Sequence, residues 1–300
     1  MNFQRTKCLI CDSENHEPYL QAPNRFNTQE TFHLVRCARC GFVYLSPRPV
    51  QECMGRYYED ERYHPHQRNG VSRTDRLYRV LRGWNLRNKR RLIERNCAKG
   101  SILDVGCGTG EFLTEMRGAG WRVLGIEPAS QARDFAKKDG LRVLDRIEKC
   151  HDRFDAITLW HVLEHVHEAH DLLHQLCKLL SPQGRIFIAV PNPDSFDAKI
   201  YGPHWIAFDA PRHLYHFRPQ DMRMFLHTHG LKVIRQSALF LDPWYNSLFS
   251  CRLKSEIKGK KIGAYEFITC GAVASYASFN GRFNRSSSSS PIYIARHGDR

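Results

Sequence analysis

The fold is decided by one stretch of the sequence, the residues SILDVGCGTG from Ser101 to Gly110. A short apolar strand runs directly into a Gly-x-Gly-x-Gly turn, and Glu111-Phe112-Leu113 then opens a helix. Glycines permit a sharp strand-to-helix turn and let a ligand approach the backbone closely. About twenty residues after the turn, the run Val123–Glu127 predicts a second strand that ends in an acid, which can bind the hydroxyls of a ribose. The pattern predicts an α/β domain with a nucleoside-type cofactor at its first strand-to-helix turn.

Two features of this stretch argue against a dinucleotide as that cofactor. The glycines are spaced Gly-x-Gly-x-Gly, whereas the dinucleotide pattern is Gly-x-Gly-x-x-Gly. Asp104 also lies two residues before the first glycine. A carboxylate at that position repels a pyrophosphate and attracts a cofactor that carries an ammonium group.

DVGCGTG, followed by the strand that ends at Glu127, resembles motif I and the ribose-binding acid of class I S-adenosylmethionine-dependent methyltransferases. The resemblance continues through Phe154–Val166 and Gly184–Asn192. It implies S-adenosylmethionine as cofactor and methyl transfer as the reaction. It implies that Gly106, Gly108 and Gly110 shape the loop around the cofactor. It implies Asp104 near the amino-acid end of the cofactor and Glu127 on the ribose hydroxyls. It also implies Asp145 beside the adenine, and Trp160 and His161 at the methionine end.

The order of the expected elements supports this fold. Strands are expected near 101–105, 122–127, 141–144, 154–160, 184–190, 231–240 and 291–296, and helices separate the first five. A helix from about Pro219 to His229 is expected before the sixth. Alternating β and α elements predict a doubly wound, Rossmann-like sheet of seven strands. The last strand resembles the antiparallel seventh strand of these methyltransferases. We therefore expect the methyltransferase domain to span 100–300, with an insertion at about 241–288 and a flexible loop at Ser286–Ser290.

An N-terminal module over residues 1–52 is predicted to be a zinc ribbon with four cysteine ligands. Cys8-x-x-Cys11 and Cys37-x-x-Cys40 form two paired-thiol turns with 25 residues between them. Two such pairs complete a tetrahedral S4 site, which leaves no open position and makes the zinc structural. Gly41 suits the tight turn after the second pair, and the residues between the pairs are expected to form a loop or hairpin. The alternatives are a redox dithiol and a chance grouping of cysteines.

Residues 53–99 are predicted to be a linker and a basic amphipathic helix. A turn is expected at Asn69-Gly70. Apolar residues then recur at helical spacing from Leu77 to Leu92. The other faces carry Arg73, Arg76, Arg79, Arg82, Arg87, Lys89, Arg90, Arg91 and Arg95. These cations form either a solvated face or a ridge that recruits a phosphorylated or nucleic-acid substrate. The absence of interleaved aromatic residues disfavours nucleic acid.

The candidate general bases are histidines, because methyl transfer to a hydroxyl or acidic carbon requires removal of a proton near neutral pH. His213 and His216 lie in the segment Asp209–Phe217, where a crevice forms beyond the strand ends. This Pro-Arg-His-Leu segment resembles a loop of zinc-ribbon-bearing bacterial methyltransferases. Trp205, Phe208 and Tyr215 can wall an acceptor pocket there, and Arg212 can clamp a phosphate or carboxylate. The alternative is a structural histidine that holds a long loop in place.

The segment His161-x-x-Glu164-His165 matches an inverted zinc-protease pattern, which its position directly after a buried strand rules out. It also resembles the Glu-x-x-Glu-His segment of ubiquinone-pathway O-methyltransferases, where a divalent ion is implicated. His161 replaces the first Glu here, which puts that ion in question. We expect the segment to line the cofactor site, with His165 as a third candidate base.

The composition indicates which partners and which cellular compartment to expect. The 300 residues carry a formal charge of +14, which favours an anionic small-molecule acceptor and permits contact with an anionic membrane surface. No apolar leader is visible at the start, and Ile262–Asn280 is too polar to span a bilayer. Eleven cysteines, an odd number, fit a reducing cytoplasm better than a disulfide framework.

The sequence therefore predicts methyl transfer from S-adenosylmethionine to O, N or C of a small molecule such as a sugar, a nucleotide-sugar or a lipid-linked intermediate. The alternatives are an RNA or protein methyltransferase that uses the ribbon and the basic helix for recognition, and a non-catalytic binding module. No Asp/Asn-Pro-Pro-aromatic motif follows the fourth strand, and no Pro-Cys nucleophile occurs. Their absence disfavours methylation of DNA bases.

Overall fold

The computed structural model describes residues 2–58 and 73–298, the side chains of 73–78 excepted. The turn expected at Asn69-Gly70 and the side chains of Arg73 and Arg76 lie outside the described part. The remaining predictions can be compared with the structure.

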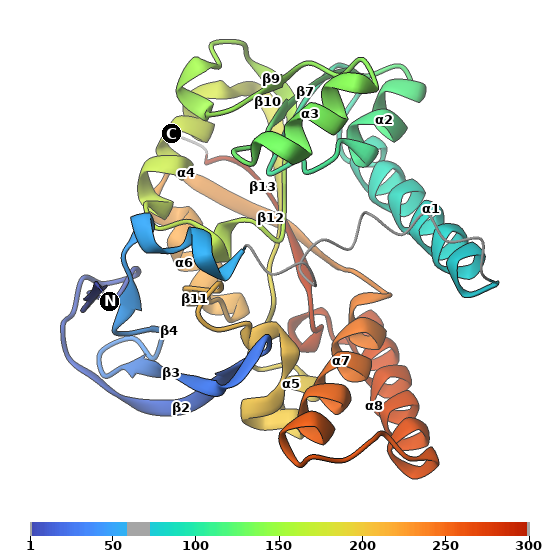
Figure 1. Ribbon diagram of the computed structural model, residues 1–300. Helices are drawn as coiled ribbons and strands as arrows, with labels where there is room; N and C mark the ends of the chain where they lie inside the picture. Colours follow the sequence, from blue (N-terminus) through green and yellow to red (C-terminus); the bar gives the residue numbers. More distant parts are fainter. Residues whose placement is uncertain (1, 59–72, 299–300) are drawn as a thin grey trace.

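A seven-stranded sheet forms the centre of the molecule (Figure 1), with the strand order β12-β13-β10-β9-β6-β7-β8. Strands β6 to β10 run parallel to one another, and β13 is antiparallel to both β10 and β12. The predicted seven-stranded, Rossmann-like methyltransferase sheet is confirmed, including its antiparallel last strand. The strands are β6 (Ser101–Val105), β7 (Arg122–Ile126), β8 (Val143–Leu144), β9 (Phe154–Trp160), β10 (Leu180–Ala189), β12 (Leu231–Ala238) and β13 (Pro291–His297).

Helices cover both faces of this sheet, and its central strands are apolar on both sides. Alternate residues point to opposite faces, because the side-chain period of a strand is two. Ile102 packs with Phe112 and Met116 on one face, and Leu103 belongs to the cluster of Leu173 and Leu176 on the other. The helices are α1 (Arg73–Glu94), α2 (Glu111–Gly118), α3 (Ser130–Lys138), α4 (Ala169–Leu179), α5 (Phe196–Tyr201) and α6 (Pro219–Thr228).

The N-terminal residues form a second sheet that borrows a strand from the methyltransferase domain. A hairpin of β2 (His16–Asn24) and β3 (Asn27–Cys37) continues into β4 (Val43–Leu45). Its order is β11-β4-β3-β2, and β11 (Tyr215–His216) comes from the predicted acceptor loop. The hairpin expected between the cysteine pairs is present. A small two-stranded sheet of β1 (Phe3–Gln4) and β5 (Arg48–Pro49) lies beside it.

The segment that was expected to be an insertion folds as two helices, α7 (Asp242–Ile257) and α8 (Ala264–Phe283), which lie side by side (Figure 1). Cys251 donates its thiol to the carbonyl of Glu266 at 3.6 Å and so links the two helices. No helix in the described ranges is long and apolar enough to cross a bilayer.

The interpretation of Ser286–Ser290 as a flexible loop is wrong for Ser288–Ser290, whereas Ser286 is exposed. Ser288, Ser289 and Ser290 are each at most 1% exposed. The carbonyl of Ser289 accepts from Asn192 N at 2.9 Å, and that of Ser290 accepts from Leu239 N at 3.1 Å. A run of serines can therefore be core structure where the backbone groups and hydroxyls find partners.

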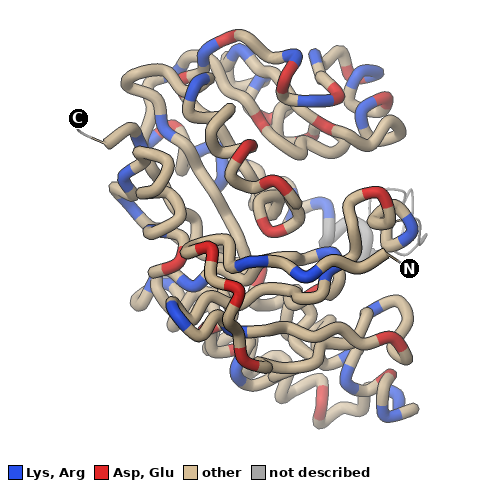
Figure 2. Tube along the Cα trace, turned by 90° about the vertical axis from the view of Figure 1, so that its left-hand side faces the viewer, with Lys and Arg blue, Asp and Glu red and all other residues tan. Residues whose placement is uncertain are grey.

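The basic face of α1 is neither wholly solvated nor a continuous ridge. Arg82 pairs with Glu111, Arg90 pairs with Glu115 at 2.8 Å, and Lys89 faces the inside of the domain. Figure 2 shows Lys and Arg scattered along the whole trace and interspersed with Asp and Glu. The positive charge is therefore spread over the molecule.

Candidate functional site

The glycine loop after β6 has the shape that a bound nucleoside requires. Gly106, Gly108 and Gly110 all have a left-handed backbone, with φ of 68°, 55° and 82°. A side chain at Gly106 would collide with Val162, whereas a side chain at Gly108 would point into open space. Gly110 begins α2, so the loop presents backbone N–H groups at a helix start.

Two predicted acids lie on either side of this loop. Glu127, directly after β7, accepts hydrogen bonds from the N–H groups of Gly108 and Ala129, both at 2.9 Å. Asp104 is 3% exposed and accepts from the hydroxyl of Thr158 at 2.6 Å. Burial raises the pKa of Asp104 to about 7, against the opposing effects of Thr158 and Lys89. Without a cofactor, Asp104 is therefore poised to change charge near neutral pH.

Trp160, which the resemblance places at the methionine end of the cofactor, lies beside Lys89. The Lys89 ammonium lies 4.4 Å from the centre of the Trp160 ring, and Phe112 contacts the same ring edge-on at 5.6 Å. Burial lowers the pKa of Lys89, while Asp242 and Asp104 act in the opposite direction. The sequence placed Lys89 on either a solvated face or a basic ridge, because helical spacing alone does not show which basic residue turns inward.

His161 occupies a strained position at the end of β9, with φ of 57°. Its Nδ1 lies 3.2 Å from Glu164 Oε1, and its Nε2 lies 2.9 Å from Asp242 Oδ2. Burial opposes a charge on His161, but the two carboxylates outweigh it and raise its pKa to about 9. With its pKa at about 9, His161 is protonated at neutral pH and donates from both ring nitrogens, so it is unsuited to act as a base there.

Asp145, which the resemblance places beside the adenine, follows β8 at the edge of the same region. It pairs with Lys149 at 2.8 Å. The hydrogen bond from Lys149 lowers the pKa of this partly buried carboxyl.

Glu164, His165 and His213 form a cluster whose ligand atoms all lie within 4.8 Å of one another; Glu164 and His213 are buried and His165 is partly buried. Glu164 is fully buried, and its Oε2 has no hydrogen-bond partner in the described part of the chain. Burial opposes its ionisation, but His161 outweighs that effect and lowers the pKa of Glu164. Burial and the neighbouring His213 lower the pKa of His165 to about 4. This set of one carboxylate and two neutral imidazoles suits a divalent cation.

The two histidines of the Pro211–Phe217 loop differ in their surroundings. His213 Nδ1 lies 2.8 Å from the carbonyl of Ala207, and its Nε2 lies 3.9 Å from Asp209 Oδ2. His216 is 1% exposed, packs against Phe208, and neither of its ring nitrogens has a partner among the described residues. Burial and His213 lower the pKa of His216 to about 3.

The same loop holds a buried ion pair. Arg212 is fully buried and donates from Nε and Nη2 to the carboxylate of Asp209. It also donates to the carbonyl of Tyr57 at 3.1 Å. Arg25, from the tip of the N-terminal hairpin, lies 3.1 Å from the same carboxylate. The loop and the N-terminal sheet are thereby joined through charge as well as through the β4–β11 pairing.

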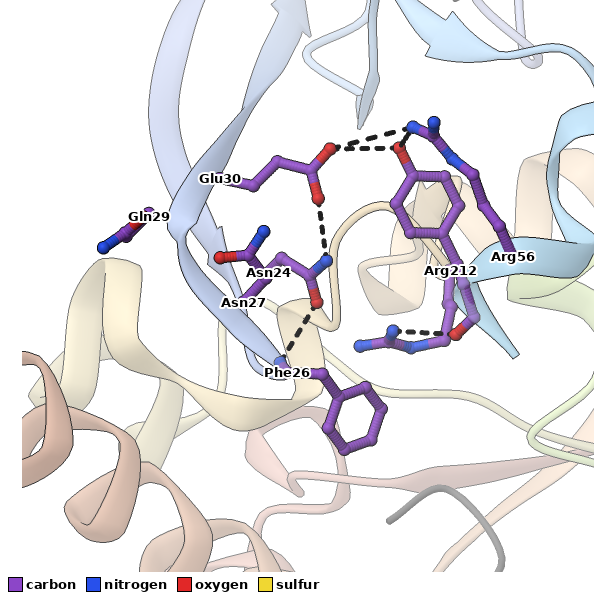
Figure 3. Close-up of a pocket in the computed structure, with 8 residues that line it drawn as sticks. Asn24, Phe26, Asn27, Gln29, Glu30, Arg56 and Arg212 are labelled. Carbon is purple, nitrogen blue, oxygen red and sulfur yellow. Dashed lines mark hydrogen bonds and ion pairs between the residues drawn. The ribbon is translucent and has the colours of Figure 1, made fainter. Parts of the chain in front are cut away.

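A cavity of about 580 Å³ opens between the N-terminal hairpin and this loop. Figure 3 shows Asn24, Glu30 and Arg56 around it, with Arg212 and Phe26 along the lower side of the view. Glu30 accepts from the amide of Asn24 at 2.9 Å and from the hydroxyl of Tyr57 at 3.1 Å. The lining is Asn24, Phe26, Asn27, Gln29, Glu30, Arg56, Tyr57 and Arg212.

The four N-terminal cysteines come together as predicted. Cys8 Sγ lies 3.4 Å from Cys40 Sγ, and Cys11 Sγ lies 3.5 Å from Cys37 Sγ. All four ligand atoms lie within 4.8 Å of one another. Each pair is followed by a residue with positive φ, Asp12 at 56° and Gly41 at 76°. Tetrahedral Zn–S bonds of ~2.3 Å need sulfurs about 3.8 Å apart, so the group fits a zinc ion.

The sequence missed two members of the site. Asp242 contacts His161 from the first turn of α7, and Tyr58 lies 3.0 Å from His165 Nδ1 through its hydroxyl. The pair Asp242-Pro243 is a helix-start signal, which predicts where α7 begins but not what its first residue contacts. Both contacts join segments far apart in the chain, so no spacing rule could reveal them.

The fold, the glycine loop and the acids at the ends of β6 and β7 define a Rossmann-like methyltransferase. Residues 75–236 match the methyltransferase domain family, and because this span is more than half of the chain, the protein belongs to that family. It is an S-adenosylmethionine-dependent methyltransferase.

Individual relatives share part of the chain. The ubiquinone biosynthesis O-methyltransferase of Xanthomonas axonopodis pv. citri (strain 306) is 29% identical over 162 residues, which cover 48% of this chain and 68% of the relative. The enzyme of the same name from Xanthomonas campestris pv. campestris (strain B100) is 28% identical with the same coverage. Among solved structures, magnesium protoporphyrin IX methyltransferase of Synechocystis PCC 6803 with bound SAM has a TM-score of 0.48 and 14% identity, covering 81% of this chain and 94% of that one. The CcbJ methyltransferase of Streptomyces caelestis has a TM-score of 0.48 and 13% identity, covering 72% and 90%.

Proposed function

We propose that the protein transfers a methyl group from S-adenosylmethionine to a hydroxyl of a small, polar acceptor, and that His213 removes the proton. The observation that carries this proposal is the polar cavity. Its lining includes Arg212, which directly precedes His213 in the chain. A relative named for O-methylation, 29% identical over the methyltransferase domain, supports oxygen as the attacked atom.

His213 has the geometry of a base. Its Nδ1–H donates to the carbonyl of Ala207, so Nε2 carries the lone pair. Burial lowers the pKa of His213, which keeps the ring neutral and able to accept a proton. Asp209, 3.9 Å from Nε2, stabilises the imidazolium once it forms. In the reaction, the acceptor oxygen gives its proton to Nε2 and attacks the methyl carbon, whose bond to sulfur breaks.

The other predicted bases are less suited to this role. His161 already donates from both ring nitrogens. His165 contacts the carbonyl of Arg212 and the hydroxyl of Tyr58 through Nδ1. We therefore propose that it is a positioning residue, with Nε2 outside these two contacts. His216 sits behind His213, with ring centres 6.5 Å apart.

The cavity has the chemistry of a carbohydrate site. Three side-chain amides, of Asn24, Asn27 and Gln29, can each pair with neighbouring hydroxyls, as can the carboxylate of Glu30. Phe26 and Tyr57 add aromatic rings to the lining, and arginine guanidinium groups lie over both rings. Arg56 can neutralise a phosphate or carboxylate. We therefore propose a sugar, a nucleotide-sugar or a lipid-linked sugar as acceptor.

A zinc ion held by Cys8, Cys11, Cys37 and Cys40 belongs to the same proposal. Its role is structural, because four thiolates leave no open position. It fixes the base of the hairpin whose tip carries Asn24, Asn27 and Arg25, so it supports the acceptor pocket from outside the catalytic domain. This arrangement fits the zinc-ribbon-bearing methyltransferases with a Pro-Arg-His-Leu loop that the sequence resembles.

The unpartnered Oε2 of Glu164 favours one addition to this scheme. Glu164, His165 and His213 would hold a divalent cation, which would lower the pKa of an acceptor hydroxyl bound to it. His213 would then be a ligand and the acceptor would lose its proton to water or to another group. The two schemes differ in one measurable property, the dependence of methyl transfer on added metal.

The test is transfer of radiolabelled methyl from S-adenosylmethionine to a panel of monosaccharides, nucleotide-sugars, phenols and tRNA. For the acceptor that is labelled, His213→Asn should lower kcat by about 10²–10⁴-fold and leave cofactor binding intact. His227→Asn, on the exposed side of α6, is the matched control. Asn27→Ala should raise KM with little change in kcat. Labelling of tRNA alone would overturn the proposal. Activity that is lost on brief chelator treatment, with the zinc still bound, and returns on addition of Mg²⁺ would favour the metal scheme over the His213 base.

A further inference from the structure

One face of α8 exposes apolar side chains along the whole helix. They recur at intervals of three or four residues and therefore share one face. Tyr265 is 77% exposed, Phe279 is 64% exposed and Phe283 is 71% exposed. The row is Tyr265, Ile268, Ala272, Tyr276, Phe279 and Phe283; we call it the α8 row.

The face on the other side of α8 is the one that packs on the protein. Cys270, Ala274, Ala277 and Gly281 are buried there, and a side chain at Gly281 would come within 3.1 Å of Ser288. Small residues thus bring α8 close to the rest of the fold. Of the aromatic residues in the row, Tyr276 contacts the ring of Phe196 in α5 at 4.4 Å, whereas Tyr265, Phe279 and Phe283 are the most exposed. A surface helix normally has a polar outer face, so the apolar α8 row requires another explanation.

The surroundings of the α8 row are basic. Exposed apolar side chains also occur on α7, at Tyr245 and Leu248. Between residues 241 and 288 the chain has seven cations, all exposed, against three acids. One of these acids, Asp242, is bonded to His161, and Glu266 accepts from Gly263 N at 3.1 Å. The cations are Arg252, Lys254, Lys258, Lys260, Lys261, Arg282 and Arg285.

We propose that the α7–α8 hairpin docks the enzyme on an anionic membrane surface, with the α8 row inserted at the level of the lipid headgroups. Exposed aromatic rings flanked by lysine and arginine are the combination that holds a helix at such an interface. The rings enter the apolar boundary and the cations pair with lipid phosphates. Pairing with a second copy of the chain would instead bring two sets of seven cations together, which the charge disfavours. Docking of this kind is independent of which acceptor is methylated.

The test uses the full, zinc-loaded protein and sedimentation with vesicles of phosphatidylcholine alone or mixed with phosphatidylglycerol. We expect binding to the mixed vesicles that weakens with salt. The double variant Phe279→Gln/Phe283→Gln should bind about tenfold or more weakly, because two rings no longer leave water. Phe135→Gln, an exposed aromatic of α3, is the matched control and should bind like the wild type. S-adenosylmethionine affinity should be the same in all three proteins.

A second variant separates charge from apolar contact. Lys258→Gln/Lys260→Gln/Lys261→Gln should lose the preference for phosphatidylglycerol while the protein stays folded. No binding of the wild type to mixed vesicles would overturn the proposal. A concentration-dependent dimer that the Phe279→Gln/Phe283→Gln variant abolishes, without vesicle binding, would overturn it in favour of a second copy on the α8 row.

Discussion

The Nε2 atom of His161 lies 2.9 Å from Asp242 Oδ2, and this contact ties the end of the central sheet to the first turn of α7. His161 belongs to the cofactor region that the resemblance predicts, whereas Asp242 belongs to the segment expected to be an insertion. The helical hairpin is therefore connected to the predicted cofactor region. Substitutions in that hairpin can affect chemistry as well as surface contacts.

Asp242→Asn should lower the pKa of His161 from about 9 toward the usual range for histidine. The carboxylate that stabilises the imidazolium is removed, and burial and Glu164 remain. The measurement is an NMR titration of the histidine ring signals in zinc-loaded protein without any other added divalent metal. Asp171→Asn, on the exposed face of α4, should leave His161 unchanged. An unaltered pKa in Asp242→Asn would mean that Glu164 alone sets the charge.

Glu127→Gln should weaken S-adenosylmethionine binding by about 10- to 100-fold. The carboxylate holds the loop through Gly108 and Ala129 and is expected to accept from the ribose hydroxyls. Charged hydrogen bonds of this kind contribute about 1.5–3 kcal/mol each. Calorimetric titration measures the change, with Asp134→Asn on the exposed side of α3 as control. Unchanged affinity would remove Glu127 from the cofactor site.

Cofactor affinity should rise with pH across the range near 7. Burial raises the pKa of Asp104 to about 7, so the group is protonated and neutral in the free protein below that pH. A cofactor that carries an ammonium group binds the ionised form better, so its Kd should fall as the pH rises from about 6 to 8. Lys89 and Glu127 face the same group with opposing effects.

Asp104→Asn should flatten this pH profile and weaken binding at the high-pH end. The stability of the protein without cofactor depends on pH in the opposite direction to the cofactor affinity. A carboxyl whose folded pKa is raised stabilises the fold below its unfolded pKa of 3.8, and that contribution is lost as the pH rises through about 7. A steeper pH profile in Asp104→Asn than in the wild type would assign the dependence to another group.

Much of the fold could be predicted because its signals are local. The turn from Asp104 to Gly110, the strand periods and the CxxC spacing each lie within a few residues. Contacts between distant segments carried no such signal. The pairing of Tyr215 with Tyr44 and the contact of Asp242 with His161 depend on how whole layers pack. The burial of the serines at 288–290 was not predicted for the same reason. A run of serines predicts a solvated loop, and the sequence does not show that the backbone N–H groups of Asn192 and Leu239 bind its carbonyls.

One zinc ion per chain is the expected metal content of the purified protein. Cys37→Ser should lose it, and a strong chelator should remove it from the wild type slowly. Because the ribbon is small and closed by the metal, loss should lower Tm and expose the hairpin to protease. Elemental analysis and limited proteolysis check both effects. Cys53→Ser, outside the cluster, is the control, and a wild type without zinc would leave the thiols as a redox or purely structural group.

Asp209→Asn should destabilise the protein by about 3–5 kcal/mol, because it leaves the fully buried Arg212 without its counter-charge. Burial opposes ionisation of Asp209, but Arg25 and Arg212 outweigh it and hold its pKa well below the usual range. Asparagine keeps the volume and tolerates the positive φ of 35° at this position, so the change isolates charge. Urea unfolding measures the effect. The double variant Asp209→Asn/Arg212→Met should recover part of the loss, since the unpaired charge is gone. If the loss of unfolding free energy in the double variant equalled the sum of the losses in the two single variants, the two residues would contribute to stability independently. Pairing with Asp209 would then not be the role of Arg212.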